Sequence, residues 1–237
     1  MKKITLYLIT TLLLCGCIIT DDITPEELDK PNSGLVLRIT FDNKNAEDIS
    51  GYNQDGVINS SNFVTNTPNG EGYAYNIVNE DDLIRVPYNP LKEISEYSIC
   101  FWVRDPSQGL LLNAYGNSTN SSSANFPTIR ISNNNFYAGF SWGSISDHFT
   151  YDSTTILQNG DWHHVVITVT PDYQHLYING SRMSTQQTNV DYSESSEIHI
   201  GGALGNIAGA LMKIDNIRLY NRAIPDSQIK LIINEER

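Results

Sequence analysis

The sequence predicts an all-β fold, an antiparallel β-sandwich that ends in one short C-terminal helix. Short runs rich in β-branched and aromatic residues recur along the chain, and turn formers such as Asn179-Gly180 separate them. No stretch between these runs has a helical period, which disfavours the βαβ units of a parallel sheet. The length also fits, because one sandwich routinely reaches about 200–250 residues, and this chain has 237.

The predicted strands follow one another from residue 35 to residue 220. In LVLRITF (35–41), every second residue is a large apolar one, a period that is typical of a half-buried strand. Similar runs predict further strands at 83–88, 97–105, 110–116, 128–132, 135–142, 162–170, 175–180, 197–201 and 211–220. The Asn/Ser-rich piece 117–127 is interpreted as a flexible loop between two of them.

Only the last stretch, PDSQIKLIINEE, has a helical pattern. Pro225 suits the first turn of a helix, and the acid Asp226 favours the positive end of the helix dipole. Ile229, Ile232 and Ile233 fall on one side of such a helix. These features predict a short helix at the end of the domain.

Residues 1–16 have the features of a lipoprotein signal peptide. A basic start, Lys2-Lys3, precedes an apolar stretch at 4–14 whose 11 residues are too few to span a bilayer, which needs ~20. Such a stretch is typical of an export signal. It ends in LCGC, which resembles a bacterial lipobox and implies cleavage before Cys17 and lipidation of that residue. An ordinary secretory signal with incidental cysteines is the alternative.

A lipid on Cys17 would tether the chain to a membrane without spanning it. Several acyl chains hold a protein firmly, because each buried methylene adds ~0.8 kcal/mol. Residues 17–33 contain two prolines and a cluster of acids, and we interpret them as a lipidated tether to a domain of residues 34–237. We therefore expect an exported protein anchored to a bacterial membrane, the outer membrane by preference, facing the periplasm or the cell surface.

The charge and the cysteine content exclude several classes of protein. The net charge of −12 disfavours nucleic acid as a partner and direct binding to an anionic surface. If Cys17 is lipidated, Cys100 is the one other cysteine of the mature chain, so no internal disulfide can form. Cys100 lies in a predicted strand, and we expect an inert core thiol there.

Four stretches of the chain resemble one family, and they occur in the order of that family. They are LRITFDNKNAEDISGYNQDGVI, YSICFWVR with Trp102, DWHHVVITVTPDYQHLYINGSRM, and KIDNIRLYNRAIPDSQI. From about Leu35 to Ile233 the sequence resembles the laminin G-like jelly-roll domains of the concanavalin A-like lectin/glucanase superfamily. The resemblance implies a jelly roll that recognises carbohydrate without catalysis. The alternative is a domain of the same fold that binds another protein or helps to build a cell-surface complex.

The adjacent residues His163 and His164 are expected to be structural. Successive residues of a strand point to opposite faces, so the two rings do not close on the same ion. One histidine is therefore expected inside the sandwich, held by hydrogen bonds, and the other on an outer face.

No catalytic group stands out, so we do not expect an enzyme. Glycoside hydrolysis is the remote alternative, because the superfamily includes retaining glucanases, which need two carboxyl groups about 5–5.5 Å apart. Their E-x-D-x-x-E strand is absent from the sequence. Two acidic clusters are interpreted as solvated turns or loops: Glu80, Asp81 and Asp82, and Asp191, Glu194 and Glu197.

A structural Ca²⁺ is the cofactor that the resemblance implies. In the superfamily such an ion often links the loop after the first strand to the start of the last, and the matching residues are Asp42, Asp48 and Asp215. Asp215 lies in an otherwise apolar strand, where an unpaired carboxylate is costly to bury. Two interpretations stay open: calcium, which takes oxygen ligands, or a buried carboxylate that is either hydrogen-bonded to backbone amides or paired with Arg218 or Arg222. The absence of a His/Cys cluster disfavours zinc.

A sugar site needs exposed aromatic side chains flanked by amides or carboxylates. The stretch NFYAGFSWGSISDHFTYDS (135–153) is the richest in such residues. By alternation, about half of its aromatic side chains must face the core. The expected ligand-binding residues are Tyr115, Tyr137, Trp142, Asp147, His148 and Tyr151.

Overall fold

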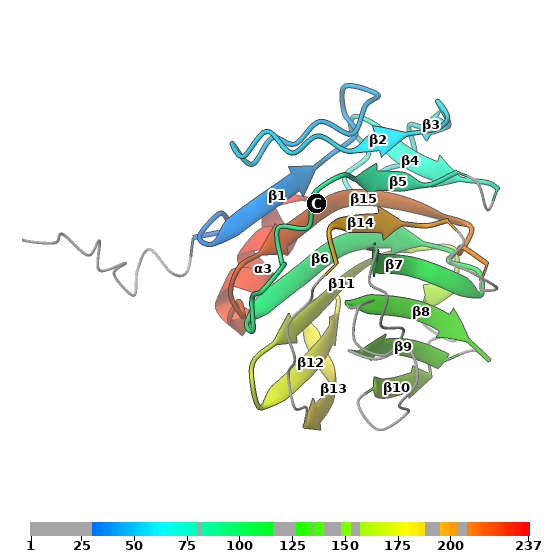
Figure 1. Cartoon of the computed structure of the whole chain (residues 1–237). Helices are drawn as coiled ribbons and strands as arrows, with labels where there is room; N and C mark the ends of the chain where they lie inside the picture. Colours follow the sequence, from blue (N-terminus) through cyan, green and yellow to red (C-terminus); the bar gives the residue numbers. More distant parts are fainter. Residues whose placement is uncertain are drawn as a thin grey trace, which may run out of the picture.

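The computed structural model describes residues 30–79, 82–115, 127–133, 135–139, 148–152, 157–187, 195–202 and 208–237. Within these residues, two antiparallel β-sheets pack against each other, and one α-helix lies against the outside of one sheet (Figure 1). The predicted antiparallel sandwich with a short C-terminal helix is thereby confirmed. No helix in this part of the chain has the length and apolar character that a membrane crossing requires.

Sheet A contains β1 (Leu35–Ile39), β3 (Phe63–Val64), β4 (Ala74–Ile77), β6 (Tyr97–Arg104), β11 (Trp162–Val169), β12 (Tyr173–Ile178), β13 (Ser181–Gln187) and β15 (Met212–Tyr220). Their order is β13-β12-β11-β6-β15-β4-β3, and β1 pairs with β15. Sheet B contains β2 (Val57–Ile58), β5 (Ile84–Val86), β7 (Gly109–Tyr115), β8 (Thr128–Ser132), β9 (Asn135–Gly139), β10 (His148–Asp152) and β14 (Glu197–Ile200). Their order is β10-β9-β8-β7-β14-β5-β2. The helix α3 (Asp226–Glu235) follows β15.

The two sheets meet across one large apolar core. Ile99, Phe101 and Val103 of β6 point into it from sheet A, and Ile198 and Ile200 of β14 point into it from sheet B. The residues between them face outward, because the side chains of a strand alternate. Complete burial of such a side chain contributes about 1.5–3 kcal/mol, so this core holds the sheets together.

A second apolar cluster fills the space between α3 and the outer face of sheet A. Ile229, Ile232 and Ile233 of α3 belong to it, together with Cys100 and Trp102 of β6. The predicted apolar side of the helix is therefore the side that packs. Cys100 is a free and completely buried thiol, as predicted, and burial raises its pKa.

Buried charges fix the end of the chain to this cluster. The Glu236 carboxylate accepts a hydrogen bond from Trp102 Nε1 at 2.7 Å and another from Arg218 Nε at 2.6 Å. The side chains of Arg218 and Glu236 are 0% and 2% exposed. Arg218 also donates to Glu235 at 2.9 Å and to Asn32 at 3.1 Å. We call Trp102, Arg218 and Glu236 the C-terminal anchor.

Both adjacent histidines are buried. His163 is hydrogen-bonded through both ring nitrogens, to Asn159 at 2.9 Å and to Asn179 at 3.0 Å. His164 lies on the outer side of sheet A, but the C-terminal anchor covers it, with the ring of Trp102 at 5.1 Å. Neither nitrogen of His164 has a hydrogen-bond partner among the described residues. Burial lowers its pKa to about 3, so the ring is neutral and makes no ion pair with Glu236, 3.9 Å away.

Replacing His164 with leucine should change the free energy of unfolding at pH 7 by less than about 1.5 kcal/mol, because leucine has a similar volume and buries no polar atom. The neutral histidine contributes stability that is present above its unfolded pKa of 6.5 and is lost as the pH falls toward about 3. The loss reaches about 1.4 kcal/mol per pH unit. Urea unfolding at a series of pH values should therefore show a flatter acid limb for His164→Leu, and parallel pH profiles would contradict this account.

The strands β2, β3, β4, β10 and β13 were not predicted from the sequence. The first two are two residues long, too short to show a period. The edge strand β13 has mostly exposed or half-buried polar side chains, so apolar alternation is absent. The turn before β13 does match its prediction, because Asn179 and Gly180 have φ values of 52° and 78°, the pair of positive angles that a tight hairpin requires. The predicted loop at 117–127 lies outside the described residues, apart from its last residue.

The last residues of the predicted tether contact the domain. Tyr220 Oη donates to the Pro31 carbonyl at 2.7 Å, and Arg222 Nε donates to the Ser33 carbonyl at 3.2 Å. Residues 31–33 are therefore held against the end of β15 and the segment that follows it. The predicted signal peptide and Cys17 lie outside the described residues.

Candidate functional site

The outer face of sheet B carries a continuous row of polar positions. Cross-strand pairing leads from Arg85 to His199, Asn113 and Thr128. Paired residues lie on the same face of a sheet. We call the described side chains of this face and its neighbouring rows the polar face: Arg85, Asn113, Thr128, Arg130, Tyr137, Glu197 and His199.

The groups of the polar face bind one another. Arg85 donates to Glu197 at 3.2 Å, and His199 Nε2 lies 3.3 Å from the same oxygen. Burial opposes the ionisation of Glu197, but the hydrogen bonds from His199 and Arg85 outweigh it and lower its pKa. Thr128 donates to Asn113 at 2.8 Å, and both are almost completely buried. Glu197 therefore belongs to a strand and an ion pair, which corrects its interpretation as part of a solvated loop.

The structure describes only part of the predicted sugar site. Tyr137 lies on the polar face, with its ring centre 5.1 Å from the Arg130 guanidinium carbon. At the backbone level, Tyr115 pairs with Glu197 and His148 pairs with Gly139, whereas Tyr151 pairs with the core residue Phe136. The other two predicted ligand-binding residues, Trp142 and Asp147, lie outside the described residues.

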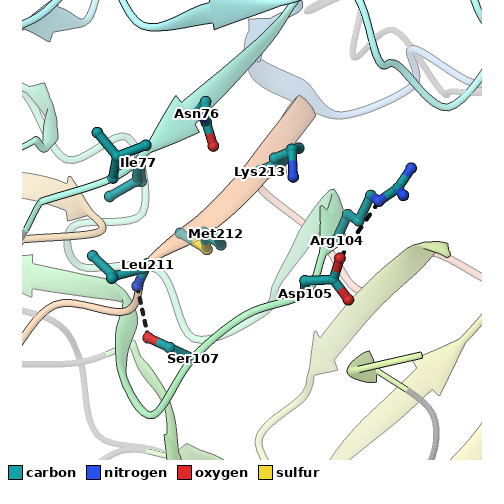
Figure 2. Close-up of a pocket in the computed structure, with 9 residues that line it drawn as sticks. Asn76, Ile77, Arg104, Asp105, Ser107, Leu211, Met212 and Lys213 are labelled. Atoms are coloured by element: carbon teal, nitrogen blue, oxygen red, sulfur yellow. Dashed lines mark hydrogen bonds and ion pairs between the residues drawn. The ribbon is translucent and has the colours of Figure 1, made fainter. Parts of the chain in front are cut away.

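A pocket of about 290 Å³ opens beside the neighbouring strands β4, β6 and β15. Figure 2 shows Met212 in the middle, with Ile77 and Leu211 on one side and with Arg104 and Asp105 on the other. Small-ligand sites combine apolar walls with a few polar groups in this way. The pocket is therefore a second candidate site, which the sequence reasoning missed.

One cross-strand row supplies the charged side of this pocket. Asn76, Lys213, Arg104 and Trp162 are direct neighbours on β4, β15, β6 and β11. Asn66 accepts hydrogen bonds from Arg104 Nη1 at 2.7 Å and from Trp162 Nε1 at 2.9 Å, which holds the guanidinium beside the half-buried indole. We call these four strand residues the cationic row.

A sequence signal for the cationic row does exist. Arg104 ends the apolar strand YSICFWVR, and Lys213 opens the apolar strand MKIDNIRLY. Each is a cation in a strand whose other outward residues are mostly buried. Such positions are unusual for cations unless they pair or bind a ligand. Only the strand order shows that the two residues are neighbours.

Asp48, one of the predicted calcium ligands, is hydrogen-bonded by backbone amides. Its Oδ1 accepts from the N–H groups of Arg38 at 3.0 Å and Ser50 at 2.9 Å, and its Oδ2 accepts from Gln54 at 3.0 Å. The residue is 5% exposed. These bonds shape the loop after β1, and they account for the buried carboxylate without an ion.

Asp215 is buried, and no cationic side chain that the structure describes pairs with it. It is 2% exposed and accepts a hydrogen bond from the N–H of Asn216 at 2.8 Å. Neither Arg218 nor Arg222 makes an ion pair or hydrogen bond with it in the described part of the chain, since they bind other residues. Burial raises the pKa of Asp215 to about 8, and the negative charge of Asp42 adds to the rise.

Asp42, the third predicted ligand, is held close to a glycine. Its Oδ1 accepts a hydrogen bond from the N–H of Tyr73 at 3.4 Å, and a Cβ on Gly72 would lie only 1.9 Å from this oxygen. Asp42 and Asp215 thus form a pair of mutually repelling acids, which suits a hard cation. The described residues contain no cluster of three His, Cys, Asp or Glu side chains that could hold a metal, so carbonyl oxygens or water would have to complete the site.

The prediction of a solvated acidic turn is wrong for Asp82. This residue is 6% exposed, and its Oδ2 accepts hydrogen bonds from the N–H groups of Val78 and Asn79 and from the side-chain amides of Asn62 and Asn79. The carboxylate therefore organises the turn between β4 and β5. The other members of the two acidic clusters, Glu80, Asp81, Asp191 and Glu194, lie outside the described residues.

The family of the chain follows from its sequence over this same scaffold. Residues 78–230 match a laminin G family model that is described as the concanavalin A-like lectin/glucanases superfamily. The chain belongs to this superfamily. The matched residues include the whole polar face and three residues of the cationic row, Arg104, Trp162 and Lys213. No curated protein matches the chain at a significant level.

Solved structures share the concanavalin A-like, lectin-like fold. The receptor-binding domain of botulinum neurotoxin D matches with a TM-score of 0.65 and 19% identity, over 87% of this chain and 54% of that chain. The binding domain of Paraclostridial Mosquitocidal Protein 1 matches with a TM-score of 0.64 and 18% identity, over 87% and 53%. The ligand-binding domain of botulinum neurotoxin D in complex with N-acetylneuraminic acid matches with a TM-score of 0.63 and 18% identity, over 86% and 52%. This chain spans about half the length of each, and the likeness concerns the fold alone.

Proposed function

We propose that this domain binds carbohydrate without catalysing a reaction, as the recognition domain of a surface or periplasmic lipoprotein. The observation that carries the proposal is the cationic row beside the pocket. It places an aromatic ring, two cations and an amide next to one another on neighbouring strands.

These groups suit the two surfaces of a sugar. The C–H faces of a sugar ring pack on aromatic rings, and Trp162 is half-buried at one end of the row. Sugar hydroxyls need donors and acceptors, and Arg104, Lys213 and Asn76 supply them. The 290 Å³ pocket lies just below the range of about 300–1,000 Å³ for drug-sized ligands. Its size therefore suits a single sugar residue.

The described carboxylates support binding rather than hydrolysis. Glycoside hydrolysis needs two carboxyl groups that face one scissile bond. Among its described side chains, the polar face offers Glu197, which Arg85 already binds. The described pocket lining offers Asp105, which is bonded to the N–H of Gly160 at 2.9 Å and lies 3.5 Å from Arg104.

Two of the similar structures hold sugar ligands. One is the neurotoxin D domain with N-acetylneuraminic acid, and another is the binding domain of botulinum neurotoxin DC in complex with SialylT. The second has a TM-score of 0.64 and 20% identity, over 87% of this chain and 52% of that chain. They support carbohydrate as the first ligand class to test on this chain.

Replacing Trp162 with alanine should weaken binding of the best ligand from a glycan array about tenfold, because the stacking surface is lost. Titration calorimetry measures the change. Tyr173→Ala is the matched control, since Tyr173 is an aromatic residue 46% exposed elsewhere on sheet A. If Tyr137→Ala abolishes binding and Trp162→Ala does not, the ligand binds to the polar face and not beside the pocket.

A protein partner is the alternative, and one observation favours it. Val78 and Leu211 line the pocket and are 45% and 39% exposed, as in contact surfaces for polypeptides. A chain that binds no glycan, but whose crosslinked partner is lost on Leu211→Asp, would support this alternative.

We propose further that a lipid on Cys17 anchors the protein to a bacterial membrane. The basic, apolar and LCGC segments of the N-terminus support this proposal. Cys17→Ser should move the protein from the membrane fraction to the soluble fraction and abolish labelling with radioactive palmitate. Retention of label by this variant would refute the anchor at Cys17.

We also propose that Asp42 and Asp215 hold a structural Ca²⁺. The ion would replace the proton of Asp215, stabilise both carboxylates and connect the loop after β1 to β15. Asp48 is not needed for this site, because its three backbone hydrogen bonds already stabilise its charge.

A further inference from the structure

The pocket contains a cation that folding does not use. Lys213 is half-buried, yet no hydrogen bond or ion pair joins its ammonium group to a residue that the structure describes. Burying even part of an unpaired charge costs free energy. In a chain with a net charge of −12, acidic partners for a lysine are plentiful. The lack of a described ion-pair partner for Lys213 therefore reflects the arrangement of side chains in the pocket and not a shortage of acids in the chain.

The neighbour of Lys213 carries the same charge. Lys213 and Arg104 are directly opposite on β15 and β6, and like charges in this position destabilise a sheet. Arg104 is compensated by Asp105 at 3.5 Å and by Asn66 at 2.7 Å. The atom of Arg104 that faces Asp105 is the buried Nε, which makes this ion pair but no hydrogen bond within the described part of the chain. The pocket therefore keeps an excess positive charge of about one, which a bound anion would neutralise.

The other residues that line the pocket indicate which further chemical groups a ligand would have. Val78 and Leu211, which are 45% and 39% exposed, give the pocket an apolar side, and Asn76 adds an amide next to Lys213 (Figure 2). A ligand that fits all three features has an apolar face, hydroxyl groups and an anionic group. A single excess cation with Asp105 close by favours a singly charged group over a phosphate, which carries up to two charges.

We infer that this pocket takes a sugar that bears a carboxylate, with the carboxylate on Lys213 and the sugar ring directed toward Trp162. The inference rests on the proposed carbohydrate binding and names the ligand class of the same site. Lys213 then determines specificity, because it distinguishes an acidic sugar from its neutral counterpart.

The test compares sugars that differ only in the carboxylate. Methyl glucuronide against methyl glucoside, and methyl galacturonide against methyl galactoside, are titrated into the full chain and followed by ligand-observed NMR. At least one acidic sugar should bind about tenfold more tightly than its neutral partner. Lys213→Gln should remove this preference, so that the acidic sugar and its neutral partner bind with equal affinity, whereas Lys213→Arg should retain most of the preference. Lys230→Gln, the same charge change on the exposed side of α3, should have no effect.

The possible failures are distinguishable. Equal affinity for acidic and neutral sugars, or a preference that survives Lys213→Gln, would overturn the inference while carbohydrate binding stands. If no sugar of the array or of the test pairs binds, the proposed function itself fails. Thermal unfolding of each variant confirms that it is folded, and the half-exposed position of Lys213 makes a large change there unexpected.

Discussion

Replacing Glu236 with alanine should lower the free energy of unfolding by about 3–5 kcal/mol, the usual cost of removing one partner of a buried ion pair. The loss is large because Arg218 is completely buried and would keep its charge without its closest carboxylate. Trp102 Nε1 would also lose its acceptor at 2.7 Å. Urea unfolding at pH 7 measures the difference.

Glu235 provides a matched control one residue away. It also binds Arg218, at 2.9 Å, but its side chain is 36% exposed, so Glu235→Ala should cost no more than about 1 kcal/mol. The double variant Arg218→Met/Glu236→Leu should recover much of the loss, because apolar side chains of similar volume avoid the desolvation of two charges. Equal losses from the two single variants would show that the C-terminal anchor does not depend on burial.

Saturating calcium should raise the Tm of the chain by about 5–10 °C. A ligand at 100 times its Kd stabilises the folded state by about 2.7 kcal/mol, and each kcal/mol shifts the Tm of a domain of this size by about 2–4 °C. The expected cause is that Ca²⁺ displaces the proton of the buried Asp215 and pairs with the carboxylates of Asp42 and Asp215. Differential scanning calorimetry with calcium and with a chelator measures the shift.

Asp215→Asn and Asp48→Asn distinguish an acid that binds calcium from an acid that stabilises the loop after β1 through backbone hydrogen bonds. Asp215→Asn should abolish the calcium response and leave the stability in chelator close to that of the original chain, because the pKa of about 8 keeps the acid largely protonated at pH 7. Asp48→Asn should lower stability in both conditions but retain the response, because its partners are backbone amides. A calcium shift that persists in Asp215→Asn would refute the site.

Most of the fold was predictable because the sequences of the interior strands show alternating or continuous apolar residues. The strands β6, β11 and β15 are mostly apolar and lie in the middle of sheet A, and the buried strand β1 pairs with β15. Their residues contact other buried residues on at least one face, so the apolar pattern is physically required. The edge strand β13 has no such requirement, and the two-residue strands β2 and β3 are too short to show one.

The candidate site was much less predictable. Asn76, Arg104, Trp162 and Lys213 are far apart in the sequence, and only strand pairing makes them neighbours. The stretch 135–153 is rich in aromatic residues, but composition does not reveal which side chains are exposed. Glu197 shows the same limit, because it stands in a serine-rich stretch of sequence but lies in a paired strand beside Arg85.

By itself the sequence determined the secondary structure of the interior, the antiparallel architecture and the family, because alternation, turn residues and local motifs act over a few neighbouring residues. Only the tertiary structure decided which polar and charged groups have a hydrogen-bond or ion-pair partner among the described residues and which do not. Those outcomes depend on contacts between residues that are far apart in the sequence or in different elements. Arg218 pairs with Glu236, the C-terminal residues cover His164, and Lys213 lies opposite a second cation, Arg104. Local patterns do not encode such contacts, since pairing and burial are properties of the assembled sheets.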